Sequence, residues 1–210
     1  LLLSLIMIYL ACIIFSGERH DGLMRMNLTK PTSRTKLYFA KISALITISL
    51  IAHLMLAIIL LIIGVCIYGT ASGSVLICVF SAGSAFGVAP FWNFIYKIIS
   101  LFISNTFYIL LTSFIALLFS NPVFSVVVSY LVYIFALITN TLLAKSAFIK
   151  FLPFIHTDLS FFFGGGVWGN SFLTSLIYSG ANFWLSLCYL SAFIALTIFA
   201  SIQIFKRQEL

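Results

Sequence analysis

The sequence predicts an all-α membrane protein, a polytopic helix bundle of which five membrane spans are visible. Of its 210 residues, 63% are hydrophobic and only 7% are charged. The mean hydropathy is +1.23. Soluble domains carry about 25% charged residues, and a spanning helix needs about 20 apolar residues. These values exclude a soluble enzyme, a disordered tail and a nucleic-acid-binding domain, despite the net charge of +7.

The apolar runs divide one transmembrane domain, residues 1–210, into its expected spans. The spans cover residues 1–15, 42–68, 98–119, 123–144 and 182–205. The first run is too short to cross a bilayer and is interpreted as the end of a helix that begins before Leu1. Between the third and fourth spans, Ser120-Asn121-Pro122 predicts a tight turn, with the proline in a first helical turn.

Three longer segments connect these spans: residues 16–41, 69–97 and 145–181. Six of the eleven basic residues fall in 16–41, which the positive-inside rule places in the cytoplasm. The other two segments are then external loops, and the whole protein has six spans. In the alternative, residues 75–95 also cross the membrane, and counting charges does not decide between the two. Residues 151–179 are strongly aromatic, which predicts a re-entrant or interfacial segment.

The segment 16–41 is the only strongly polar part of the chain. Gly22 and Pro31 bracket about two helical turns in which apolar and charged residues alternate. We expect a short amphipathic helix at the inner face of the membrane. It either transmits force from a cytoplasmic partner or binds anionic lipid headgroups, and composition alone favours the second.

Several residues of this segment follow one another in a recognisable order. They are Gly17-Glu18, Gly22, Pro31, Ser33-Arg34 and Lys41. In this order and spacing the segment resembles the one that follows the second membrane helix in the ABC-2 type transporter permease family. Leu23 stands where threonine is usual in that family. The tail at Lys206-Arg207 and Glu209, and the loop at Leu152-Pro153-Phe154, are also similar to the family.

The resemblance implies the membrane subunit of an ATP-driven exporter in the bacterial cytoplasmic membrane. The cargo would be hydrophobic or amphipathic: a peptide, an antibiotic or a lipid. Two permease chains, identical or different, would pair within the lipid, and each would bind a separate cytoplasmic ATP-binding subunit. This chain would bind no cofactor or nucleic acid and would not be catalytic, because it has no Walker A pattern and ATP and magnesium belong to the partner. The implied contacts with that partner are Glu18, Arg19, Asp21, Gly22, Arg25, Pro31 and Arg34.

Polar residues within the spans are the other candidate functional residues. His53, Asn105 and Asn140 are possible pathway residues, although packing between helices is the commoner role of such side chains. A metal site is not expected, because His20 lies on the opposite side of the membrane from His156 and Asp158. The four cysteines form no Cys-x-x-Cys pair and are expected to be buried apolar residues.

Three other functions remain open on the sequence. A secondary transporter or channel would need charges within the spans, where His53 is the only such group. An intramembrane enzyme would need a paired catalytic constellation, which the spans lack. A non-transporting anchor of a signalling or immunity complex could use the same cytoplasmic segment.

Overall fold

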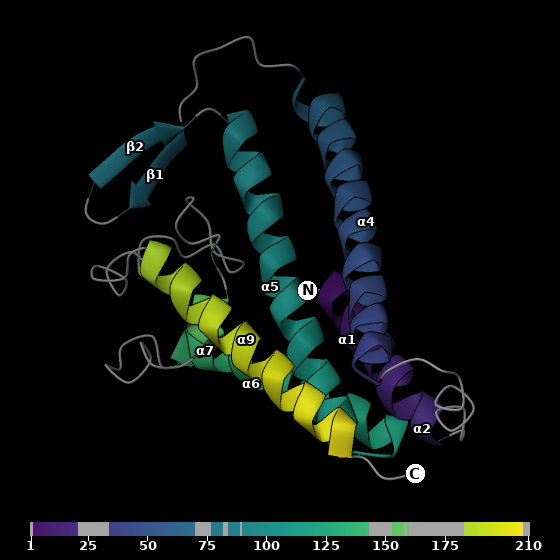
Figure 1. Ribbon diagram of the computed structural model, residues 1–210. Helices are drawn as coiled ribbons and strands as arrows, with labels where there is room; N and C mark the ends of the chain where they lie inside the picture. The colour runs from purple at the N-terminus through teal and green to yellow at the C-terminus, as the bar shows by residue number, and fades with distance from the viewer. Residues whose placement is uncertain are drawn as a thin grey trace. The chain divides into compact units, whose positions relative to one another are not determined.

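The computed structural model describes residues 2–20, 34–69, 77–81, 84–88, 90–142, 153–157, 159 and 183–207. Most of these residues are helical, and Figure 1 labels the helices along the chain. Within these described ranges, four helices are long and apolar enough to cross a membrane. They cover Thr35–Ile67, Phe91–Leu118, Pro122–Thr139 and Ser186–Phe205. The helices therefore indicate a protein embedded in a membrane as a helical bundle.

The chain begins with a shorter apolar helix, α1 (Leu2–Cys12). It continues without a break into a π-helix, η1 (Ile13–Gly17), and then into the single turn α2 (Glu18–His20). A π-helix is rare and is frequently found at functional positions. The expected amphipathic helix between Gly22 and Pro31 lies outside the described residues.

The helices α4 (Arg34–Tyr68) and α5 (Pro90–Leu118) both begin earlier than the expected spans at residues 42 and 98. Hydropathy detects the apolar residues that lie in lipid. A helix can extend past them into polar residues, until a capping or helix-breaking residue ends it. Helix α4 stops at a glycine: Gly69 has a φ of +70°. The Gly69 N–H donates to the Val65 carbonyl at 2.9 Å, a left-handed cap that favours glycine.

Two further long helices follow, α6 (Pro122–Leu142) and α9 (Phe183–Arg207). The expected turn before α6 acts as its N-cap, because Asn121 Oδ1 accepts the Val123 N–H at 3.0 Å. Pro122 occupies the first helical position, where its missing N–H costs no hydrogen bond. Between these helices lies one short helix, α7 (Pro153–His156); the remainder of the expected re-entrant segment, apart from Thr157 and Leu159, lies outside the described residues.

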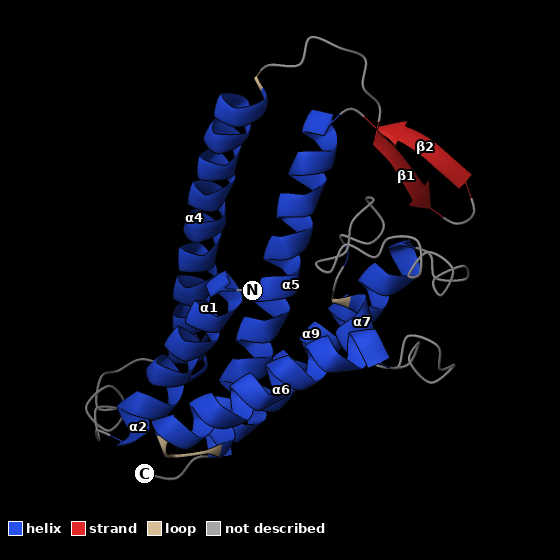
Figure 2. Ribbon diagram, turned by 180° about the vertical axis from the view of Figure 1, so that it is seen from behind, coloured by secondary structure: helices blue, strands red, loops and turns tan. Residues whose placement is uncertain are grey.

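Two short strands interrupt the helices, β1 (Ile77–Ser81) and β2 (Ser84–Val88), shown in red in Figure 2. They pair antiparallel, with Ile77 opposite Val88 and Ser81 opposite Ser84. The β-branched and aromatic residues of this segment favour strand over helix. A hairpin over residues 77–88 means that this segment does not form a spanning helix, and it adds a small β element to the expected helical fold.

The chain divides into two compact units. The first unit contains Leu1–Ser49, Asn105–Ile138 and Ser191–Leu210, and the second contains Leu50–Ser104 and Thr139–Leu190. In the first unit one face of α4 is buried. The ring of Tyr38 on this face lies 5.7 Å from Phe15 and 5.9 Å from Phe205, between centroids. In the second unit, by contrast, the α4 residues Ile51, Ile58 and Ile62 are exposed, as expected of a lipid-facing helix.

Candidate functional site

Only some of the residues expected to contact a partner lie in the described part of the chain. Glu18 lies in α2 with its side chain described. Arg19 is in the same turn and Arg34 begins α4, but only their backbones are described. Asp21, Gly22, Arg25 and Pro31 lie outside the described residues. The structure therefore describes the two ends of segment 16–41 but not its middle.

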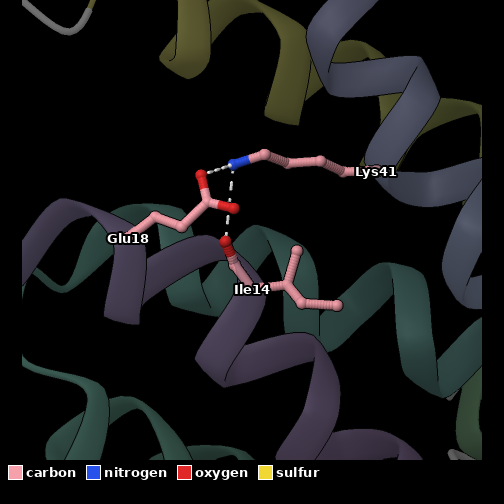
Figure 3. Close-up of polar contacts among 3 residues, drawn as sticks. All are labelled: Ile14, Glu18 and Lys41. Carbon is pink, nitrogen blue, oxygen red and sulfur yellow. Dashed lines mark hydrogen bonds and ion pairs between the residues drawn. The ribbon is translucent and has the colours of Figure 1, made fainter. Parts of the chain in front are cut away.

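The carboxylate of Glu18 forms an ion pair with the ammonium group of Lys41, which lies on α4 (Figure 3). The Lys41 side chain is 10% exposed and that of Glu18 is 27% exposed. Both ends of the basic segment are thus held together by this pair, which we call the Glu18–Lys41 clamp. Glu18 is directed to a residue of its own chain, although the resemblance implied that it contacts another subunit.

The surroundings of Lys41 come from the π-helix η1. The Lys41 ammonium donates to the Ile14 carbonyl at 3.4 Å, and it lies 5.6 Å from the centre of the Phe15 ring. A lysine this deeply buried needs an anion and further acceptors to offset its lost hydration. The carboxylate, the carbonyl and the ring supply these together, which explains how a charged side chain is accommodated at this depth.

The next residue of η1 connects the clamp to the turn between α5 and α6. The fully buried Ser16 donates its hydroxyl to the Phe119 carbonyl at 2.9 Å. The Ser125 hydroxyl of α6 lies 3.2 Å from Ser16 Oγ. Successive residues of η1 therefore contact α4 on one side and the α5–α6 turn on the other.

Helix α1 is also joined to α6 by polar contacts. Cys12 Sγ donates to Ser129 Oγ at 3.6 Å, and the Tyr130 hydroxyl donates to the Leu5 carbonyl at 3.1 Å. As residue numbers rise along α1 and η1, those of their α6 partners fall, so the helices run antiparallel. Polar bonds of this kind fix the packing of membrane helices. A displacement of α2 would therefore reach α1, α4, α5 and α6 together.

Of the possible pathway residues, Asn105 joins two helices. In the first unit its Nδ2 donates to Ser49 Oγ of α4 at 3.0 Å. The side chain is 2% exposed, and its Oδ1 has no hydrogen-bond partner within the described ranges. This geometry is that of a packing contact, with one acceptor left for a water molecule or ligand.

His53 and Asn140 take different positions. In the second unit the buried His53 ring meets the Phe102 ring edge-to-face, with centroids 5.7 Å apart. Asn140 lies in α6, and only its backbone is described. The structure therefore shows a ring contact for His53 and leaves the pathway role of both residues a prediction.

Sequence reasoning missed a buried polar cluster in the second unit. His156 Nδ1 lies 3.0 Å from Ser186 Oγ of α9, and the His156 ring lies 4.6 Å from that of Tyr189, between centroids. The Ser104 hydroxyl of α5 donates to the Thr157 carbonyl. These contacts fix α7 against α5 and α9. No sequence signal pairs residues so far apart, since they share no spacing or motif along the chain.

Metal ligands and cysteine thiols are the remaining candidates for chemistry in the described part of the chain. In those ranges no three His, Cys, Asp or Glu residues come close enough to hold a metal ion. Cys12 is buried as expected, whereas Cys66 and Cys188 are exposed on their helices. The best-defined polar arrangement in these ranges is the joint made by the clamp and η1.

Comparison with known proteins corrects the expected family. A search of curated proteins found no match. The profile of the DUF2705 family, described as a protein of unknown function, matches residues 1–210. The resemblance to the ABC-2 type permeases is therefore wrong as an assignment. It depended on a few common residues in a loose order, which many basic loops between membrane helices also contain. The match over the whole chain shows that this protein belongs to the DUF2705 family.

Proposed function

We propose that this chain is the membrane subunit of a transport complex, which exports a hydrophobic or amphipathic substrate with energy from a separate ATP-hydrolysing subunit. The force-transmitting part of this proposal depends on the described contacts and not on the corrected family resemblance. The observation that carries it is the Glu18–Lys41 clamp, together with the contacts of η1. This joint lies where the one strongly polar segment enters the apolar helices.

The clamp supports a force-transmitting role for the segment 16–41. A flexible loop dissipates a displacement, whereas a segment fixed at both ends passes it on. Glu18 and Lys41 hold the two ends together, and Ser16 connects them to Phe119 at the end of α5. A partner that moved this segment would consequently move several membrane helices at once.

The composition of the helices argues against coupling to an ion gradient. Ion-coupled transporters place acidic or basic side chains within the membrane. After Lys41 along the chain, the described residues of the four candidate spans hold two basic or histidine residues, His53 and Lys97, and none that is acidic. The His53 ring packs on Phe102. An external energy source, supplied by a cytoplasmic partner, fits this arrangement better.

The test is copurification of the full chain with candidate ATP-binding proteins from the same host, with ATPase activity measured in each preparation. Gly22→Trp with Arg25→Glu alters the segment without touching the clamp. We expect this variant to lose the partner while remaining folded in the membrane. If no ATPase copurifies with the wild type, or if the variant binds it equally well, the proposal is wrong.

A second pair of variants separates binding from transmission. Glu18→Lys breaks the clamp, and Glu18→Lys with Lys41→Glu restores it with the charges exchanged. We expect the single variant to bind the ATPase but to lose stimulation of its activity by substrate, and the exchanged variant to regain part of it. Equal stimulation in all three proteins would show that the clamp does not transmit force.

A further inference from the structure

One face of α5 near its start carries a polar stripe that has no role in the proposed transport function. It consists of Asn93, Lys97, Ser100 and Ser104. These positions follow the i, i+4, i+7, i+11 spacing, so they lie one above another on the helix. All four belong to the second unit. A polar stripe on a helix this apolar needs polar partners, because lipid offers none.

Two members of the stripe are buried and each has a polar atom without a hydrogen-bond partner among the described residues. Asn93 and Ser100 are each 3% exposed. Neither Asn93 Oδ1 nor Ser100 Oγ has a hydrogen-bond partner within the described part of the chain. The Ser104 hydroxyl, in contrast, has two acceptors for its single proton, the Ser100 carbonyl at 2.9 Å and the Thr157 carbonyl. Buried polar groups in native proteins are nearly always satisfied, so these two atoms indicate a missing hydrogen-bonding group.

Lys97 lies between these two residues on the stripe and is half-buried. Glu18 is the only acidic residue in the described ranges, and it pairs with Lys41. No acidic side chain of the described chain therefore neutralises Lys97. A partly buried ammonium group favours an anion beside it.

Aromatic residues of the same helical turns indicate the depth of the stripe in the membrane. Phe91, Trp92 and Tyr96 are all exposed. Their rings adjoin, with centroids 6.0 Å apart for Phe91 and Trp92 and 6.5 Å apart for Trp92 and Tyr96. Exposed tryptophan and tyrosine gather at the level of the lipid headgroups. Asn93 and Lys97 lie in these same turns and therefore at this level, and Ser100 lies about one turn further along the helix.

We propose that Asn93, Lys97 and Ser100 bind the headgroup of an anionic lipid that carries a hydroxyl group beside its phosphate. The Lys97 ammonium pairs with the phosphate, and the Ser100 hydroxyl donates to a phosphate oxygen. Asn93 Oδ1, an acceptor without a donor, accepts the lipid hydroxyl. The site is independent of the proposed transport function, and it remains if no ATPase partner exists.

The test measures lipid binding to the purified full chain by native mass spectrometry. The probes are phosphatidylglycerol, which has the phosphate and hydroxyls, and phosphatidylmethanol, which has the same charge without a hydroxyl. We expect the wild type to bind phosphatidylglycerol several-fold more tightly than phosphatidylmethanol. Lys97→Gln should weaken binding of both lipids about tenfold, the loss of one charge-assisted contact. Equal binding of both lipids by the wild type would overturn the assignment of Asn93.

Matched control variants distinguish a specific lipid site from non-specific attraction of anionic lipids to a basic protein. Lys36→Gln removes an exposed lysine of α4 and should leave binding of both lipids unchanged. Asn93→Ala should abolish the preference for phosphatidylglycerol while retaining phosphatidylmethanol binding. If Lys36→Gln and Lys97→Gln weaken binding equally, the attraction is non-specific and the site is refuted. If soluble glycerol phosphate displaces the lipid at equal concentration, the site serves a soluble phosphate ester and the lipid assignment is wrong.

Discussion

Breaking the Glu18–Lys41 clamp should cost stability, and Glu18→Gln should cost more than Lys41→Met. After Glu18→Gln, the 10%-exposed Lys41 loses its counter-charge and keeps neutral partners alone among the described residues: the new amide oxygen, the Ile14 carbonyl at 3.4 Å and the face of the Phe15 ring. After Lys41→Met, the 27%-exposed Glu18 can regain water. The more deeply buried charge suffers more from losing its partner.

The size of the effect follows from the two exposures. Removing one partner of a fully buried pair costs about 3–5 kcal/mol, and an exposed pair contributes about 0–1 kcal/mol. The clamp lies between these limits, so we expect about 2 kcal/mol for Glu18→Gln and about 1 kcal/mol for Lys41→Met. The double variant should show a coupling energy of about 1 kcal/mol.

The assay is reversible unfolding of the full chain in mixed micelles by increasing SDS, followed by far-UV circular dichroism. The wild type, both single variants and the double variant complete a double-mutant cycle. Lys36→Met, an exposed lysine of the same helix, is the matched control and should change stability by less than about 0.5 kcal/mol. A coupling energy below about 0.3 kcal/mol, or a larger cost for Lys41→Met than for Glu18→Gln, would refute the reasoning.

Two further predictions concern polar contacts of the helices and use the same unfolding assay. Asn121→Ala removes the acceptor of the Val123 N–H and should destabilise the protein by about 1 kcal/mol, whereas Asn121→Asp keeps the cap and should not; equal losses in both would contradict the capping role. Ser49→Ala removes the acceptor of Asn105 Nδ2 and should cost about 0.6 kcal/mol, the mean for bonds between membrane helices. Thr47→Ala, which removes only a bond within its own helix to the Ser43 carbonyl, should cost less, and a reversed order would show that the Ser49–Asn105 bond is not stabilising.

The described helices illustrate what could be predicted from local sequence. Long apolar runs predicted a helical membrane protein, and four of the described helices are long and apolar enough to span. Helix ends were less predictable: α4 begins at Arg34 and α5 at Pro90, because the helices extend past the apolar residues that hydropathy detects. The sequence left open whether residues 75–95 cross the membrane, and the hairpin over residues 77–88 was not predicted.

The contacts of the candidate site were harder to predict from the sequence than the helices. The sequence marked Glu18 as a contact for another subunit but did not predict its ion pair with Lys41, 23 residues away. The family resemblance failed for a related reason. Glycine, proline and basic residues recur in loops between membrane helices, so their order alone does not identify a family.

By itself, the sequence determined that this protein lies in lipid and that its main elements are helices. Both follow from local properties: the length of an apolar run sets whether a helix can cross lipid, and a proline or glycine sets where it starts or stops. Only the tertiary structure decided which polar residues meet. Ser16 and Phe119, Ser49 and Asn105, and His156 and Ser186 are far apart in the chain and have no shared pattern. Their pairing depends on how helices pack, and in lipid that packing is set by side-chain shape and a few hydrogen bonds rather than by the hydrophobicity that a sequence displays.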